Sequence, residues 1–203
     1  MAAEDRQRTY RGGRDFERTR EPSGRPAPAG DAGPRSVMRI HDARRMHFDR
    51  RLRVGGVLKS WSGPEGPSDD PGDERLAVPT EDQPLAYKDF EGVIPKGEYG
   101  GGTVIVWDRG TYEPLTHDRR GHPVDSAGSL ERGRATFRPR GAELHGEYAP
   151  TRFRGGTDGQ EAWLLVREGP ARPDAHGMPD PRRARPARTG RMPAQVAAAD
   201  GER

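Results

Sequence analysis

The sequence predicts a mostly β protein whose short antiparallel strands form a compact barrel or sandwich. Apolar and polar residues alternate with a period of two in several short segments, a pattern typical of strands with one buried face. Turn residues separate these segments, because the chain holds 28 glycines and 20 prolines among its 203 residues. The sequence shows no helical period of convincing length. We therefore expect an antiparallel β-barrel with only short helical and loop elements.

The first two strands are expected within residues 36–54. The first begins at Ser36–Ile40, and a turn leads from it into a second strand that starts near Met46. In the second strand the apolar side chains share one face, which we expect to be buried, and the polar ones share the other: Met46, Phe48, Leu52 and Val54 against His47, Asp49, Arg51 and Arg53. Gly55 and Gly56 can supply the positive φ angles of a tight hairpin, so residues 57–61 are expected to return as the partner strand.

Further strands are expected at residues 75–78, 103–107, 111–112, 134–138, 143–148 and 162–167. The tripeptide Asp108-Arg109-Gly110 is predicted to form a turn between two of them. A glycine-rich stretch follows Lys96, but it lacks the ordered spacing of a phosphate-binding loop, so a backbone bend is expected there. Trp61 and Trp107 are predicted to pack in the core rather than to serve as base-stacking surfaces.

Composition places one folded domain between two tails. Hydrophobic residues make up 30% of the chain and charged residues 33%, which indicates that part of it does not fold. We expect disorder in residues 1–13, a docking segment and linker in 14–35, the β-barrel domain in 36–168 and an Arg/Pro/Ala-rich disordered tail in 169–203. The chain lacks cysteine and any apolar run of about 18 residues, which argues against disulfides, thiolate metal sites and a membrane span. A cytoplasmic, nucleoid-associated protein is expected.

A candidate metal site lies in the segment from His41 to Leu52. Side chains two apart on a strand point the same way, so His47 and Asp49 should converge, with Arg51 one step further along. A turn before this strand could bring His41 back beside them. Two imidazoles and a carboxylate suit a catalytic divalent metal such as manganese, zinc or ferrous iron, and an adjacent arginine can hold a phosphate. A polar strand face that is merely solvated is the competing interpretation.

Several ordered motifs resemble the 3'-phosphoesterase domain of bacterial DNA ligase D. The resemblance runs in order through about residues 10–168, and its motifs are Arg14-Asp15-Phe16, Thr19–Pro22, His41–Leu52, Gly56–Trp61, Arg75–Val78, Phe90–Gly100, Trp107–Gly110 and Trp163–Val166. The remaining residues could not hold a polymerase or ligase domain, so a stand-alone form is expected. The resemblance implies a compact β-barrel that trims DNA 3' ends in double-strand break repair by non-homologous end joining. It would remove a terminal ribonucleoside and then the exposed 3'-phosphate.

The resemblance also assigns roles to individual residues. It implies that His41, His47 and Asp49 hold a divalent metal, most simply Mn²⁺, while Arg51 grips the phosphate. Other matched positions would assist catalysis (Arg45, Tyr87 and the position of Gln83) or bind substrate and phosphate (Arg14, Asp15, Glu21 and Arg75). The implied partners are DNA 3' ends, together with a separate end-joining ligase and polymerase, and no membrane.

Two departures from the family pattern lead to an alternative function. The usual Asp-His-Pro-Leu is Asp82-Gln83-Pro84-Leu85 here, and glutamine can donate a hydrogen bond but cannot act as a titrating acid. The usual Pro-Lys-Gly-Pro contains Glu65 in place of lysine, which puts a negative charge close to a phosphate path. The alternative is therefore a catalytically weakened or inactive module that binds DNA 3' ends.

Two other interpretations remain open from the residues alone. The ligands His41, His47 and Asp49 could form the facial triad of an iron oxygenase, although oxygen chemistry has no need of the neighbouring arginines. The remaining histidines have no partner at metal-ligand spacing: His117, His122, His145 and His176. A folded loop could still bring His117 or His122 to the position where Gln83 replaces the family histidine.

Overall fold

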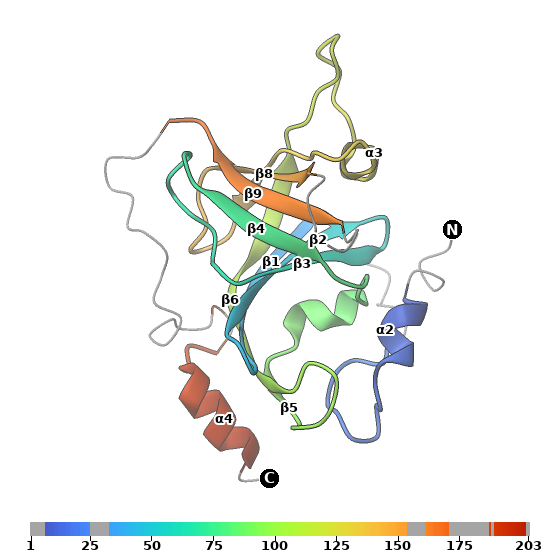
Figure 1. The fold of residues 1–203 in the computed structure, drawn as a ribbon, viewed down its shortest axis with the longest axis vertical. Coiled ribbons are helices and arrows are strands. Elements are labelled where there is room, and N and C mark those ends of the chain that lie inside the picture. Colours follow the sequence, from blue (N-terminus) through green and yellow to red (C-terminus); the bar gives the residue numbers. More distant parts are fainter. Residues whose placement is uncertain (1–6, 25–32, 154–160, 171–186, 188, 202–203) are drawn as a thin grey trace.

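Eight antiparallel strands close into a barrel in the computed structural model, which describes residues 7–24, 33–153, 161–170, 187 and 189–201. The strand order is β1-β2-β3-β4-β9-β8-β7-β6, and pairing between β1 and β6 closes the circuit. Strand β5 pairs only with β6 and lies beside the barrel (Figure 1). The predicted antiparallel β-barrel is confirmed.

The elements have the following bounds. The strands are β1 Arg35–Asp42, β2 His47–Val54, β3 Val57–Gly63, β4 Glu74–Pro79, β5 Gly92–Ile94, β6 Gly102–Pro114, β7 Phe137–Arg140, β8 Glu147–Phe153 and β9 Ala162–Glu168. The helices are α2 Arg8–Gly12, the 3₁₀ helix η1 Leu85–Asp89, α3 Ser126–Glu131 and α4 Pro193–Gly201.

The β2–β3 hairpin follows from its two glycines. Gly55 and Gly56 have φ angles of 58° and 83°, which residues with a Cβ rarely adopt. The tight turn pairs Val54 with Val57 and sets the register of the whole hairpin. The sequence prediction of this turn is confirmed.

The barrel interior holds the main hydrophobic core. Phe48, Leu52 and Val54 of β2 point into it, as their alternation predicts. Trp61 and Trp107 are 5% and 6% exposed and belong to the same cluster, so the prediction that they pack in the core is confirmed.

A second apolar cluster covers the outer face of β2 and its neighbours. Helix α2, the light-green η1 in Figure 1 and strand β5 contribute to it, and its buried members are Tyr10, Leu58, Tyr87, Phe90, Ile94 and Val104. Asp49 is only 8% exposed and Arg51 only 3%. Sequence alternation predicted one buried face for β2, and that was wrong because a second layer covers the polar face as well.

Strand β6 is longer than the sequence predicts. Asp108, Arg109 and Gly110 do not form a turn but continue the strand, which pairs with β1 along its length. The pairing register shifts between Met38 and Arg39, which leaves Trp107 as the extra residue of a β-bulge. A bulge bends a strand without ending it, and this explains why turn-like residues occur inside β6.

The other predicted boundaries shift by a few residues. Strand β7 begins at Phe137 and β8 begins at Glu147, so the strands expected at 134–138 and 143–148 both lie further along the chain. The polar loop before β7 contains the short helix α3, whose N-terminus is capped by the Asp125 carboxylate.

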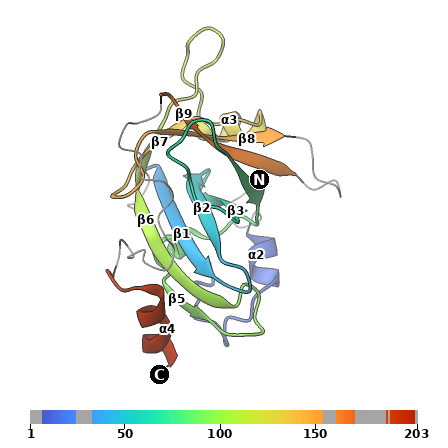
Figure 2. The same ribbon diagram turned by 60° about the vertical axis from the view of Figure 1, so that its left-hand side comes forward.

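Parts of both predicted tails are ordered. In the N-terminal stretch Tyr10 of α2 is fully buried, and in the C-terminal stretch Val196 of α4 is 2% exposed. The Asp200 carboxylate accepts a hydrogen bond from the Val93 backbone N–H at 2.8 Å, which holds α4 against β5 (Figure 2). The helices α2 and α4 thus lie within the two predicted tails, while residues 1–6, 171–186, 188 and 202–203 lie outside the described residues.

Among the described helices, none combines the length and the apolar character that a membrane crossing requires.

The close approach of β6 and β7 at Gly110 generates a stability prediction. A Cβ at this position would lie 2.1 Å from the Arg140 carbonyl oxygen, so we expect Gly110→Ala to lower the free energy of unfolding by about 1–3 kcal/mol, the usual cost of overpacking. Urea unfolding measures this change. Gly12→Ala is the control because nothing lies within 4 Å of its Cβ, and it should leave the midpoint unchanged or higher. Equal midpoints for both variants would contradict the close approach.

Candidate metal centre

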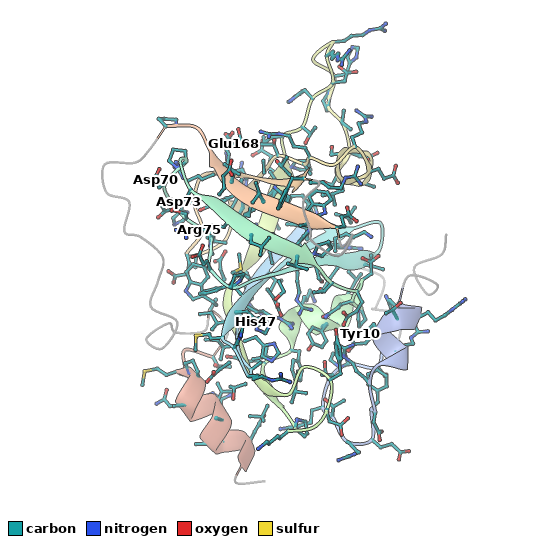
Figure 3. All side chains as sticks on the ribbon, viewed as in Figure 1. Tyr10, His47, Asp70, Asp73, Arg75 and Glu168 are labelled. Carbon is teal, nitrogen blue, oxygen red and sulfur yellow. The ribbon has the colours of Figure 1, made fainter. Side chains whose placement is uncertain are left out.

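The β1–β2 pairing brings the three predicted ligands together. His41 lies directly opposite His47 in the register, and their ring centroids are 4.6 Å apart. Asp49 follows two residues after His47 on the same face. One ligand atom from each of the three residues lies within 4.8 Å of the other two, which is close enough for a single cation to bind all three. Figure 3 shows His47 beside the lower end of β1.

Hydrogen bonding fixes which nitrogen of His47 is available. Its Nδ1 lies 2.9 Å from the Arg45 backbone oxygen, and a carbonyl only accepts, so Nδ1 carries the proton. The Nε2 atom then faces the Asp49 Oδ1 atom at 3.6 Å. A backbone carbonyl that orients a histidine in this way is a common outer partner of metal-binding imidazoles.

His41 supplies the observation that tests whether a metal fits. Its ring hydrogen-bonds to the backbone of Gly100, while its Nε2 is buried and has no hydrogen-bond partner among the described residues. Burial lowers the pKa of His41 to about 4, so the imidazole is neutral at pH 7 and its lone pair is free to bind a cation. A buried nitrogen without a partner, next to a second imidazole and a carboxylate, fits a divalent metal.

Asp49 is ionised and oriented by Arg51. The Arg51 Nη2 donates to the Asp49 Oδ2 at 2.9 Å, which leaves Oδ1 facing the imidazoles. Burial by itself would raise the pKa of Asp49, but the positive charge of Arg51 lowers it below its ordinary value. The carboxylate is therefore charged at neutral pH.

A second arginine, Arg39, lies beside the triad, and the sequence reasoning missed it. Arg39 pairs with Asp49 in the register and is fully buried, and its three guanidinium nitrogens make no hydrogen bond of good geometry among the described residues, although the Tyr87 side chain interacts with the group. Burial and the nearby charge of Arg51 lower the pKa of Arg39 to about 9, so it is mostly charged at pH 7. Its spacing could have revealed it, because Arg39 lies two residues before His41 and so points to the same face of the strand.

Tyr87 supports both arginines from one side. The guanidinium carbons of Arg39 and Arg51 lie 4.2 and 4.7 Å from its ring centroid, within the range of cation–π contacts. Its hydroxyl donates to the Glu21 carboxylate at 2.7 Å, and Arg14 donates to the same oxygen at 2.8 Å. Burial raises the pKa of Tyr87 to about 12, so the hydroxyl keeps its proton and remains a donor. Four further predicted site residues and Arg39 thus form one connected network with the triad: Arg14, Glu21, Tyr87 and Arg51.

A comparison with family models covers the region of this site. A family model described as the DNA Ligase D 3'-phosphoesterase domain matches residues 39–152, more than half of the chain. The chain belongs to this family. The matched range includes all three residues of the triad, both neighbouring arginines (Arg39 and Arg51) and Tyr87.

Curated relatives share this region at substantial identity. The Multifunctional non-homologous end joining protein LigD of Pseudomonas aeruginosa is 46% identical over 157 residues, which is 76% of this chain and 17% of that protein. The homologous repair protein of Mycobacterium tuberculosis is 39% identical over 163 residues, or 80% of this chain and 20% of its own length. That of Mycolicibacterium smegmatis is 36% identical over 185 residues, or 90% and 22%. The chain therefore spans about a fifth of the length of these relatives.

Other positions taken from the phosphoesterase family lie at the margins of the network. Arg45 is exposed, and it is its backbone oxygen that contacts His47. Asp15 is also exposed, and its carboxylate accepts the Glu17 backbone N–H at 3.0 Å. Gln83 is buried and bridges to Leu58 of β3 through the backbone, while its side-chain Oε1 has no partner among the described residues.

Arg75 is not part of the network around the triad. Its guanidinium pairs with Glu65 and Asp73, both at 2.5 Å. Figure 3 shows Arg75 near Asp73 and apart from His47. Glu65, the residue that departs from the phosphoesterase pattern, therefore neutralises an arginine that the resemblance assigns to phosphate binding.

The loop histidines do not replace the missing family histidine. His117 bonds to the Leu115 backbone oxygen and His122 to the Asp118 carboxylate, and both lie on the loop that projects from the barrel before α3 (Figure 1). His145 is exposed after β7, and His176 lies outside the described residues. Gln83 therefore has no histidine substitute from the loop before α3.

The geometry of the triad predicts a single divalent-cation site. We expect isothermal titration to show one Mn²⁺ per chain, and His41→Ala to weaken the affinity by about 100-fold or more, because even outer partners of metal ligands contribute about 10- to 100-fold. His122→Ala is the control because this exposed histidine pairs only with Asp118. If His41→Ala bound the metal as tightly as the wild type, these three residues would not be the ligands.

Proposed function

We propose that this chain is a metal-dependent phosphoesterase that acts on DNA 3' ends. It would remove a terminal 3'-phosphate or 3'-ribonucleoside during double-strand break repair by end joining. The observation that carries the proposal is the buried, unpartnered His41 Nε2 within a triad that lies beside Arg39 and Arg51. Family membership supports the reaction class, and the names of the relatives support the repair context.

The triad would hold the divalent metal, which we propose to be Mn²⁺. Two imidazoles and one ionised carboxylate leave coordination positions open, which suits a catalytic rather than a structural site. A cation bound there would polarise a phosphoryl oxygen and lower the pKa of a bound water. His47 and Asp49 are already oriented for this role by Arg45 O and Arg51 respectively.

The arginine pair would bind the phosphate itself. Arg39 and Arg51 have guanidinium N–H groups without partners among the described residues, and they lie on the same face as the triad. Donors held in place before the reaction stabilise charge that develops on phosphoryl oxygens. Tyr87 restrains both guanidinium groups, so little entropy would be lost on binding. The two arginines favour an anionic substrate, and therefore a phosphoesterase rather than an oxygenase.

A DNA 3'-end-binding module with weak or no catalysis is the second candidate. The Glu65–Arg75 ion pair supports it, because a guanidinium already occupied by carboxylates is less available to phosphate. Gln83 supports it as well, because an amide cannot protonate a leaving group. In either case we propose that an end-joining ligase and polymerase process the same DNA end, in the cytoplasm at the nucleoid.

Phosphate release from a 3'-phosphate primer–template is the decisive test. With Mn²⁺ the wild-type protein is expected to release inorganic phosphate. Arg39→Met should remain folded, because an apolar side chain replaces an unpaired buried charge, yet lose about 10-fold or more in kcat/KM. Arg134→Met is the matched control because this surface arginine pairs only with exposed groups. A wild-type protein that binds metal but releases no phosphate would refute the enzyme and leave the binding module.

Restoring a histidine at position 83 separates the two candidates. If the family histidine assists the leaving group, Gln83→His should raise kcat by about 10²- to 10⁴-fold, the usual contribution of general acid–base catalysis. Single-turnover phosphate release measures this change, with Gln83→Asn as a control that adds no titrating group. If Gln83→His still binds DNA but releases no phosphate, the binding module is favoured.

A further inference from the structure

Tyr99 is an exposed aromatic side chain close to the triad. It is 57% exposed, the largest value among the large apolar side chains of the described residues. Single exposed apolar residues are common on protein surfaces and by themselves imply nothing. The position of Tyr99, rather than its exposure, is what calls for an explanation.

The Tyr99 ring is held in place from one side. The guanidinium carbon of Arg14 lies 5.1 Å from its centroid and 3.9 Å from that of Tyr10. The Tyr99 hydroxyl donates to the Glu81 carboxylate at 3.4 Å, and Arg14 pairs with the same carboxylate at 2.9 Å. The ring is therefore anchored by a buried ion pair, while the residue as a whole remains exposed.

The loop that carries Tyr99 is also tied down. The Glu98 and Gly101 backbone N–H groups donate to the Pro95 and Glu98 carbonyls at 3.2 and 3.0 Å. Arg18 pairs with the Glu98 carboxylate at 3.1 Å, which links the loop to the N-terminal segment. A ring on a restrained loop loses little freedom when a ligand packs against it.

The same loop borders the metal ligands. Gly100, the next residue, hydrogen-bonds to the His41 ring through its backbone, and a Cβ at Gly100 would lie 3.7 Å from His41 Cε1. Tyr99 therefore lies one residue away from a direct neighbour of the ligand His41. A group bound at the triad would have Tyr99 as a neighbour.

We propose that Tyr99 is the platform of a nucleobase subsite, on which the base of the 3'-terminal nucleoside stacks while its phosphate binds at the triad. This inference rests on the proposed function, because a 3'-phosphorylated DNA end places a base one sugar away from the bound phosphate. Every base has a π-face, so the subsite recognises a base without selecting its identity. The specificity that it adds is for nucleotides over other phosphate monoesters.

A fluorescence experiment tests the subsite without relying on catalysis. A primer–template with 2-aminopurine as its 3'-terminal base and a 3'-phosphate is titrated with protein in the absence of added metal. Stacking on Tyr99 should quench the fluorescence, and Tyr99→Leu should weaken binding by about 5- to 100-fold, as expected for loss of one stacked base. Tyr99→Phe should bind like the wild type, and Leu76→Ala is the control for another exposed apolar side chain.

An abasic 3'-terminal nucleotide completes a double-mutant cycle. Wild-type protein should bind it more weakly by the same factor, while Tyr99→Leu should bind abasic and base-bearing ends equally. The subsite is overturned if Tyr99→Leu loses no affinity, or if it loses as much for the abasic end, which would indicate that the ring only covers the Arg14–Glu81 pair. Phosphate release by the wild type with Mn²⁺ is scored separately, so a failed subsite is distinguishable from a failed proposed function.

Discussion

The register of β1 against β2 is the constraint on which the site depends. It sets His41 opposite His47 and Arg39 opposite Asp49, so that four functional groups share one outer face of the barrel. Because side chains alternate along a strand, the residues between them, Phe48 and its neighbours, fill the barrel interior. A slip of one residue would exchange the two sets, placing charges in the core and apolar groups outside. The core and the site therefore specify the same pairing.

The second apolar layer changes the chemistry of that outer face. Tyr10 of α2, Tyr87 of η1 and Phe90, which follows η1, cover groups that would otherwise be solvated. Removal from water lowers the pKa values of His41 and Arg39, and in this low-dielectric surrounding the charge of Arg51 acts strongly on Asp49. The same layer carries Glu21 and Arg14, which hold Tyr87 in position. The N-terminal segment is thus part of the site rather than an appendage.

Local patterns in the sequence predicted the parts of this structure that depend on local physics. The Gly55–Gly56 hairpin needs only positive φ angles, and the convergence of His47 and Asp49 needs only the strand period. Features that depend on distant residues were not predictable in this way. The bulge at Trp107 arises from pairing with β1, and the ordering of α4 depends on Asp200 meeting the backbone of Val93. Burial of the polar face of β2 likewise depends on Tyr87, more than thirty positions along the chain.

Unpaired burial by itself does not identify a ligand site, and Arg50 makes the distinction. Its three guanidinium nitrogens also lack partners among the described residues, but its side chain lies over the Phe137 ring at 4.6 Å, inside the barrel core. Arg39 has the same deficit on the opposite face, beside ionised Asp49 and the unpartnered His41 Nε2. Each buried polar group without a partner costs about 1–3 kcal/mol. An anion at the triad would satisfy Arg39 but would not reach Arg50 on the opposite face, so ligand binding would offset that cost only on the outer face.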